Sequence, residues 1–381
     1  MQHIARANNL FRQKKYQQAK EVYLDLIQKY PELKNIIDFN LKECEKKCLQ
    51  AAYDRANNSI DNMCVVLINT NYQTKNLHIT RAIYNALVRH KRVGKVVFSE
   101  YASVINDCRM HKPNILLAID GQKIIPEILY KASRYSQKSA LWTFDDPYTT
   151  RDSLAFQDIF DIVFSNDLAS TKLYASSAHL PLASPLMSDF YMPHNRIEAD
   201  EDFFYDIFFC GTAWPNRVDD LKQLIESRPN LKYKFCMPYN RHLPKKKLAN
   251  LPVTSYVFPT NFMDVIRIAR RSKVVLGLHR SFGEDKNMNS SNTPGPRVFE
   301  TAGMGAFQIV DSICGAGAYY QDCKEIVLYD DFNDLLDKLD FYLQNSVKRR
   351  EISKNAFEKT IMSHTYANRL DYMFSVIYSN K

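Results

Sequence analysis

From Met63 onwards, short apolar runs alternate with amphipathic segments, and this alternation restricts the fold of the chain strongly. Strand-length runs separated by helical segments indicate parallel strands in sheets that are covered on both faces. The runs form two series, which are 64–69, 95–99, 115–120, 140–144 and 161–165, then 206–210, 233–237, 255–258, 273–279, 306–311 and 325–329. The sequence therefore predicts an α/β protein with two doubly wound, Rossmann-like domains facing a cleft, where open parallel sheets bind their ligands.

The segments around these runs predict four domains. Residues 1–58 are helical, 59–190 and 191–350 are the two Rossmann-like domains, and 351–381 are C-terminal helices that are expected to pack back across the cleft. An irregular stretch rich in proline and acidic residues, 181–202, is interpreted as the linker between the two series.

The N-terminal helical segment contains a stretch, 9–31, that resembles one tetratricopeptide repeat. Small and aromatic residues stand where the two helices of such a repeat meet, and Pro31 ends the second helix. A single repeat cannot bury its own apolar face. Residues 1–58 should therefore pack on the rest of the chain, associate with a second copy, or hold a protein partner.

Composition limits where in the cell this protein is expected and which partners it is expected to bind. The net charge of +9 suits an acidic partner, but the basic residues are spread along the chain and no nucleic-acid-binding module surrounds them. The basic residues could lie on helix faces that are exposed to solvent, or they could form a face that rests on anionic lipid. Without a visible signal peptide or membrane span, we expect a cytoplasmic protein with at most peripheral contact at the inner membrane face. The eight cysteines lack zinc-ligand spacing and are interpreted as reduced thiols.

Glycine is concentrated in one part of the chain. Of ten glycines, seven lie at positions 277, 283, 295, 303, 305, 315 and 317. Such crowding indicates tight turns or close approach of the backbone to a ligand. A helix is predicted to begin near Pro296, and the N–H groups and dipole of a helix N-terminus favour an anion. The expected ligand is phosphorylated.

Five stretches resemble the glycosyltransferases of the GT-B fold, and specifically the family related to the spore-maturation protein CgeB. They are 141–147 (LWTFDDP), 208–217 (FFCGTAWPNR), 277–280 (GLHR), 293–305 (TPGPRVFETAGMG) and 363–369 (SHTYANR). The resemblance implies transfer of a hexose from a nucleotide diphosphate sugar, with UDP as the first expectation, to a glycan, lipid-linked or protein acceptor. It also implies no obligatory metal or other cofactor.

The resemblance places the donor in the second domain. Gly211 and Thr212 would expose N–H groups to the diphosphate, and Arg217 would add a cation, although an ordinary turn with a surface arginine is the alternative. Glu300 would accept the ribose hydroxyls, unless it only complements the helix dipole. The remaining donor residues are His279 and Arg280 for phosphates or sugar, Val257 and Phe258 for the base, and Asn292, Gly295, Pro296 and Arg297 around the helix start. Many relatives carry a glutamate at the position of Asn292, so a second donor carboxylate is not expected.

The first domain is expected to bind the acceptor. Asn71 and Tyr72 follow its first strand and are predicted to contact the acceptor. Asp145 or Asp146 is the predicted base that takes a proton from the acceptor hydroxyl, with His279 as a further catalytic candidate. The alternative is that the Asp-Asp-Pro sequence only makes a turn.

Two other functions remain open from the sequence. A sugar-nucleotide epimerase can share this architecture, and a transferase-like scaffold could use residues 1–58 to organise an assembly. Nucleotide release with an added acceptor distinguishes the transferase from the first, and nucleotide binding distinguishes it from the second.

Overall fold

The computed structural model describes residues 2–34, 37–38, 40–45, 47, 62–71, 76–190, 202–237, 251, 256–257, 261–280 and 291–379. The chain forms two compact units. One consists of Met1–Asn62 with Asp371–Lys381, and the other is Met63–Leu370.

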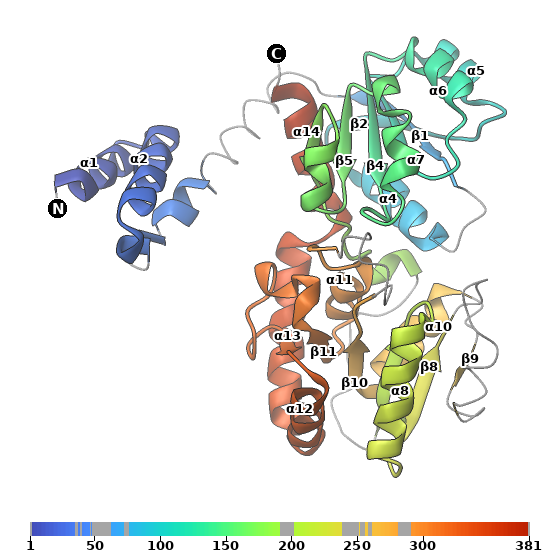
Figure 1. Cartoon of the computed structure of the whole chain (residues 1–381). Coiled ribbons are helices and arrows are strands. Elements are labelled where there is room, and N and C mark those ends of the chain that lie inside the picture. Colours follow the sequence, from blue (N-terminus) through green and yellow to red (C-terminus); the bar gives the residue numbers. More distant parts are fainter. Residues whose placement is uncertain are drawn as a thin grey trace. The chain divides into compact units, whose positions relative to one another are not determined.

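In the first unit, two helices lie side by side, α1 (Gln2–Arg12) and α2 (Tyr16–Lys29), and a 3-10 turn, η1 (Pro31–Leu33), follows them (Figure 1). Ala7 of α1 faces Ala19 and Tyr23 of α2 in a small core. The core also contains Leu26, Ile37, Leu41 and Cys44. These helices therefore have an apolar core of their own, and their assignment as a tetratricopeptide repeat stays a prediction.

A chain that begins at Asn57 is expected to fold and to bind nucleotide with the affinity of the full chain. The reason is that the core of α1 and α2 is formed by residues of that helical segment. Gel filtration, circular dichroism and UDP titration of the shortened chain measure this. Insoluble or molten protein would show instead that residues 1–56 complete the core of the other unit.

The first sheet of the Met63–Leu370 unit is parallel and has the strand order β2-β1-β3-β4-β5-β6. Its strands are β1 (Met63–Asn69), β2 (Val93–Ser99), β3 (Ile115–Asp120), β4 (Lys138–Thr143), β5 (Ile162–Ser165) and β6 (Ser177–His179). Its helices are α4 (Leu77–Arg89), α5 (Val104–His111), α6 (Pro126–Ser133) and α7 (Thr150–Leu154). The strand order reverses between β1 and β3. Sequence analysis missed β6, because Ser-Ala-His has no apolar run.

The second sheet is also parallel, with the order β12-β11-β10-β7-β8-β9. Its strands are β7 (Tyr205–Cys210), β8 (Tyr233–Cys236), β9 (Tyr256–Val257), β10 (Ser272–Gly277), β11 (Gln308–Asp311) and β12 (Val327–Tyr329). Its helices are α8 (Pro215–Ser227), α10 (Phe262–Arg270), α11 (Pro296–Gly303), α12 (Phe332–Gln344), α13 (Ser346–Ser363) and α14 (Tyr366–Ser379), the last of which continues into the other unit. This order reverses between β7 and β10. The predicted α/β class with two doubly wound sheets is confirmed.

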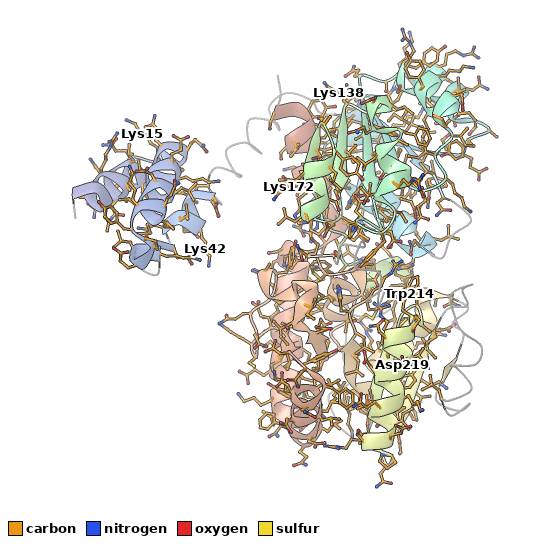
Figure 2. The ribbon with its side chains drawn as sticks, in the orientation of Figure 1. Lys15, Lys42, Lys138, Lys172, Trp214 and Asp219 are labelled. Atoms are coloured by element: carbon orange, nitrogen blue, oxygen red, sulfur yellow. The ribbon has the colours of Figure 1, made fainter. Side chains whose placement is uncertain are left out.

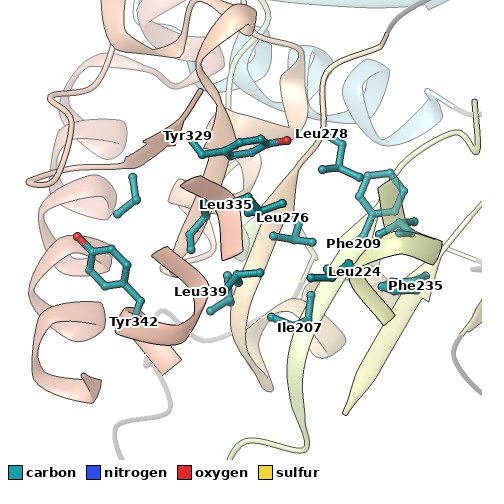
Figure 3. Close-up of a cluster of buried hydrophobic side chains, with 14 of the residues drawn as sticks. Ile207, Phe209, Leu224, Phe235, Leu276, Leu278, Tyr329, Leu335, Leu339 and Tyr342 are labelled. Carbon is teal, nitrogen blue, oxygen red and sulfur yellow. The ribbon is translucent and has the colours of Figure 1, made fainter. Parts of the chain in front are cut away.

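Alternation along the strands assigns the helices to the two faces of the second sheet. Ile207 and Phe209 of β7 face helices α8 and α12, where they meet Leu224 and Leu335 (Figure 3). Phe208 points to the opposite face and packs with α10. Each fully buried side chain of this size contributes about 1.5–3 kcal/mol. The packing fixes the strand ends, from which the loops of the candidate site leave.

The predicted linker begins as a packed segment. Leu182 and Ala183 are buried, and the guanidinium of Arg369 donates to the carbonyls of Pro181 (2.9 Å) and Leu182 (3.3 Å). Ser184 pairs with Thr365 just before α14. Residues 181–190 are therefore held in place by a buried guanidinium, and their role as the linker between the two series stays a prediction. Residues 191–201 lie outside the described part of the chain.

Candidate active site

A cavity of about 740 Å³ lies at the carboxyl ends of the strands of both sheets. The first sheet contributes the loops after β1, β4 and β5. The second contributes the loops after β7 and β10 and the start of α11. Trp214, at the end of α8 that is nearest the first sheet in Figure 2, lines it. Among the predicted site residues, those that line the cavity are Asp145, Asp146, Gly211, Thr212, Arg217, His279, Arg280, Gly295, Pro296 and Arg297.

Arg280 is stacked between two aromatic rings at this cavity. Its guanidinium carbon lies 4.0 Å from the ring centre of Tyr148 and 4.1 Å from that of Trp214. Asp145 forms an ion pair with it at 3.1 Å. Burial lowers the pKa of Arg280 and the Asp145 charge opposes this, so the group stays a cation. Cation–π contacts strengthen where water is excluded, and these three partners fix a positive charge on the cavity wall.

Arg217 joins the loops that follow β7 and β10. Its Nε donates to the Leu278 carbonyl at 3.0 Å and its Nη1 to the Thr212 carbonyl at 3.1 Å. Burial, with the nearby charge of Arg280, lowers the pKa of Arg217 to about 10. Gly211 leaves room for this side chain, since a Cβ there would lie 3.2 Å from Nη1. Arg217 therefore holds both loops in place as well as bringing positive charge to the cavity.

His279 and the start of α11 present unoccupied polar groups to the same space. The Nε2 atom of His279 is buried and has no hydrogen-bond partner, and burial lowers the pKa of the ring. Gly295 is the N-cap of α11, and a Cβ at this position would meet nothing within 4 Å. A neutral imidazole and a helix N-terminus that is not filled by side chains can together bind an anion.

Glu300 is fully buried and does not line the cavity. Its Oε1 lies 2.9 Å from His78 Nε2, and its Oε2 lies 2.8 Å from Arg297 Nη1. The His78 ring stacks on Phe262 with the ring centres 4.2 Å apart. Burial raises the pKa of Glu300, but Arg297 and His78 more than offset this, so the net shift is downward and the group is ionised at neutral pH. The carboxylate predicted to bind ribose is thus held by the Arg297 guanidinium and the His78 ring.

Asp146 has a packed environment. Its Oδ2 accepts hydrogen bonds from Thr143 (2.7 Å), Ser165 (2.7 Å) and Tyr174 (2.9 Å). Burial raises the pKa of Asp146 and these three hydroxyl groups oppose the rise. The arrangement agrees with the alternative that the Asp-Asp-Pro sequence only makes a turn. Asp145 binds Arg280, and Asp146 joins the ends of β4 and β5 through Thr143 and Ser165. A role of either carboxylate as a base stays a prediction.

The structure does not bring every predicted residue to the cavity. Asn292 is exposed, and its backbone N–H donates to Asp167 at 3.0 Å. Asn71 is buried behind the wall rather than lining it. Val257 ends the edge strand β9, while its side chain, Tyr72 and Phe258 lie outside the described residues.

Several residues at the site escaped sequence reasoning. They are His78, Tyr148, Asp167, Trp214 and Phe262. Trp214 is one of only two tryptophans and directly precedes a predicted helix, which is a usable signal. His78 has none, because its contact with Glu300 joins residues 222 positions apart.

Within the described ranges, no three His, Cys, Asp or Glu side chains are grouped so that they could hold a metal ion. Nor does any helix of those ranges have the length and apolar character needed to cross a membrane.

Comparisons with known proteins agree with this geometry. Residues 213–375 match the family model described as glycosyl transferase-like. The spore protein CgeB of Bacillus subtilis (strain 168) is 20% identical over 268 residues, which cover 67% of this chain and 80% of that protein. A glycosyltransferase from Rickettsia africae ESF-5 has a TM-score of 0.53 at 12% identity, over 84% of this chain and 100% of that one. HepE of Anabaena, solved with UDP and glucose, has a TM-score of 0.55 at 10% identity over the same shares.

Fold and comparisons agree on the class: the chain has the fold of the GT-B glycosyltransferases, and its residues 213–375 are glycosyl transferase-like. Within that class its sequence is similar to that of the spore protein CgeB, as the five sequence stretches predict.

Proposed function

We propose that this enzyme transfers a hexose from a UDP-sugar to a hydroxyl group of a glycan, lipid-linked or protein acceptor. The observation that carries the proposal is the reversal of strand order between β7 and β10, at which the loops of Gly211 and His279 open on the cavity. Open parallel sheets bind nucleotides at this topological switch point.

The diphosphate is assigned to the space between the start of α11 and these two loops. His279 Nε2, the N–H group of Gly295 and the dipole of α11, which begins at Pro296, face the diphosphate there, and Arg280 and Arg217 supply positive charge. When the bond from C1 of the sugar to the diphosphate breaks, negative charge builds up on the leaving oxygen. Fixed cations and a helix dipole stabilise that charge without reorganisation.

The nucleoside is assigned to the side of Glu300 and β9. The ribose hydroxyls would replace His78 as partners of the Glu300 carboxylate, since a carboxylate can accept two hydrogen bonds from a diol. Val257 and Phe258 remain the candidates for the base, and Asn292 stays a donor-site candidate. UDP is the preferred nucleotide because HepE, which has a similar fold, was solved with UDP and glucose.

The acceptor is assigned to the first sheet, with Asn71 and Tyr72 as candidate contacts. A cytoplasmic location is part of the proposal, and the net charge of +9 supports at most peripheral contact with an anionic inner membrane face. Residues 1–58 are candidates for contact with a protein partner or a second copy.

Incubation of the full chain with UDP-sugars tests the proposed function. We expect UDP release that rises when a suitable acceptor is added, with the sugar found on the acceptor. Conversion of the UDP-sugar into its epimer without UDP release would indicate an epimerase. A failure to bind UDP would indicate a scaffold.

Chelation with EDTA is expected to leave UDP release within about twofold of the untreated rate. Arg217, Arg280 and the α11 N-terminus neutralise the leaving diphosphate in this proposal, so a metal ion has no required role. Rates with and without EDTA, and after addition of Mn²⁺ or Mg²⁺, measure the effect. Complete loss that Mn²⁺ restores would contradict the assignment.

A further inference from the structure

Two buried polar side chains meet at the carboxyl ends of β1 and β3. Asn71 is 2% exposed and Asp120 is 1% exposed. The amide Nδ2 of Asn71 donates to Asp120 Oδ1 at 3.2 Å, and the backbone N–H of Gln122 donates to the same oxygen at 3.3 Å. The other oxygens of the pair, Asn71 Oδ1 and Asp120 Oδ2, are buried without any hydrogen-bond partner. Buried acceptors without donors are unfavourable and rare, so this pair requires an explanation.

The pair stands at the switch point of the first sheet. The chain leaves β1 for β2 on one side, whereas β3 lies on the other side of β1. In sheets of this order, ligands bind in the crevice between these two strand ends. The position matches that of Gly211 and His279 in the second sheet, where the donor is assigned.

The backbone at Asp120 is strained. Its φ is +83°, and Gly121 follows with φ +91°. The Thr70 hydroxyl accepts from the Gly121 N–H at 3.1 Å and holds this turn. A non-glycine residue in this region costs conformational energy, and such residues gather at functional sites. A carboxylate is thus kept at the strand end although its backbone is unfavourable.

Asp120 lies directly behind the wall of the cavity. Asn76 and Asp145 both line the cavity, and both act on Asp120, the first by a side-chain hydrogen bond and the second by its charge. Burial is the main cause that raises the pKa of Asp120 to about 6, and the Asp145 charge adds to it. A carboxyl group that titrates near neutral pH is suited to accept a proton during catalysis.

We propose that Asn71 and Asp120 bind a hydroxyl group of the acceptor, and that Asp120 takes its proton during transfer. This inference rests on the proposed function. The O–H proton passes to Asp120 Oδ2, and the acceptor oxygen forms a bond to C1 of the donor sugar. The bond from C1 to the diphosphate breaks, and its electron pair leaves with the diphosphate. A single displacement of this kind inverts the configuration at C1.

The other aspartates of the first sheet are less suited to this role. Asp145 is paired with Arg280, and Asp146 Oδ2 already accepts from three hydroxyl groups. Among the described residues Asp120 has no ion pair, and its side-chain donors are the neutral amides of Asn71 and Asn76.

Asp120→Asn tests the proposal, with Asp146→Asn as the matched buried control. Asparagine tolerates positive φ better than most residues, so the turn should keep its shape. The substitution removes a buried negative charge, so we expect an unchanged or higher Tm. UDP affinity, measured by calorimetry, should stay within about twofold. Asp146→Asn weakens the hydrogen bonds that the side chain accepts from Thr143, Ser165 and Tyr174, so the Tm of this control variant should fall.

Activity is measured as UDP release, with water as the acceptor, from UDP-glucose, UDP-galactose and UDP-N-acetylglucosamine. We expect Asp120→Asn to release UDP at least about 100-fold more slowly than the wild type, as is typical for loss of a general base. Nuclear magnetic resonance of the sugar product should show inversion at C1.

Three results would overturn the proposal. They are a release rate within about threefold of the wild type, a Tm that falls as much as in Asp146→Asn, or retained configuration at C1. A wild-type protein that neither binds UDP nor releases it would contradict the proposed function, and this inference would fall with it.

Discussion

Gly303→Ala is expected to destabilise the protein by about 3 kcal/mol, near the upper end of typical overpacking effects. A Cβ at this position would lie 1.9 Å from the Ser184 hydroxyl oxygen and 2.9 Å from its Cβ. Ser184 cannot move away easily, because it is fully buried and its N–H donates to the His364 carbonyl at 2.9 Å. Urea unfolding of the variant and the wild type measures the difference.

Gly295→Ala is the control for this substitution. It lies eight residues earlier, at the start of the same helix, and an added Cβ there would meet nothing within 4 Å. The free energy of unfolding should therefore change by less than about 0.5 kcal/mol. Equal destabilisation by both substitutions would show that the close contact of α11 with Ser184 is not what matters at Gly303.

Arg369→Ala is expected to cost about 3 kcal/mol or more. Its guanidinium donates to the carbonyls of Pro181, Leu182 and Ser363, and it stacks on Phe299. Each buried carbonyl left without a donor costs about 1–3 kcal/mol. Thermal unfolding and nucleotide binding should both show the loss, since the segment after Pro181 would lose its attachment to the start of α14.

The matched surface control is Arg109→Ala on α5, where the Arg109 guanidinium donates to the Asn106 side chain one turn earlier, in an exposed position. A change within about 0.5 kcal/mol is expected there. If Arg369→Ala is no more damaging than Arg109→Ala, water satisfies the three carbonyls and Arg369 does not hold the segment after Pro181 in place.

The fold follows from local pattern to a large extent. Apolar runs locate the strands of both sheets except β6, because a buried parallel strand must be apolar on both faces. The start of α11 at Pro296 follows from proline at the first helical position. The stretch after Pro181 could not be predicted in this way. Proline and polarity suggest a loose linker, but the partner that orders it, Arg369, lies 188 residues away in the sequence.

The site residues also fall into two groups, those that local pattern predicts and those that depend on distant contacts. Gly211, His279 and Gly295 reach the cavity because strand ends and helix starts place them there. His78 and Asp120 could not be identified, because neither belongs to a motif and each gains its role from contacts with distant residues. Glu300 illustrates the converse, since the motif finds the residue but not its burial between His78 and Arg297.

Calorimetric titration with UDP tests the donor site most directly, with the full chain, His279→Ala and the partly exposed control His111→Ala. The proposed function predicts one bound UDP per chain and the same affinity in His111→Ala. In His279→Ala the affinity should fall at least about tenfold, since a hydrogen bond to a charged phosphate contributes about 1.5–3 kcal/mol. Absence of UDP binding by the full chain, or equal affinity in all three proteins, would contradict the placement of the diphosphate between His279 and the start of α11.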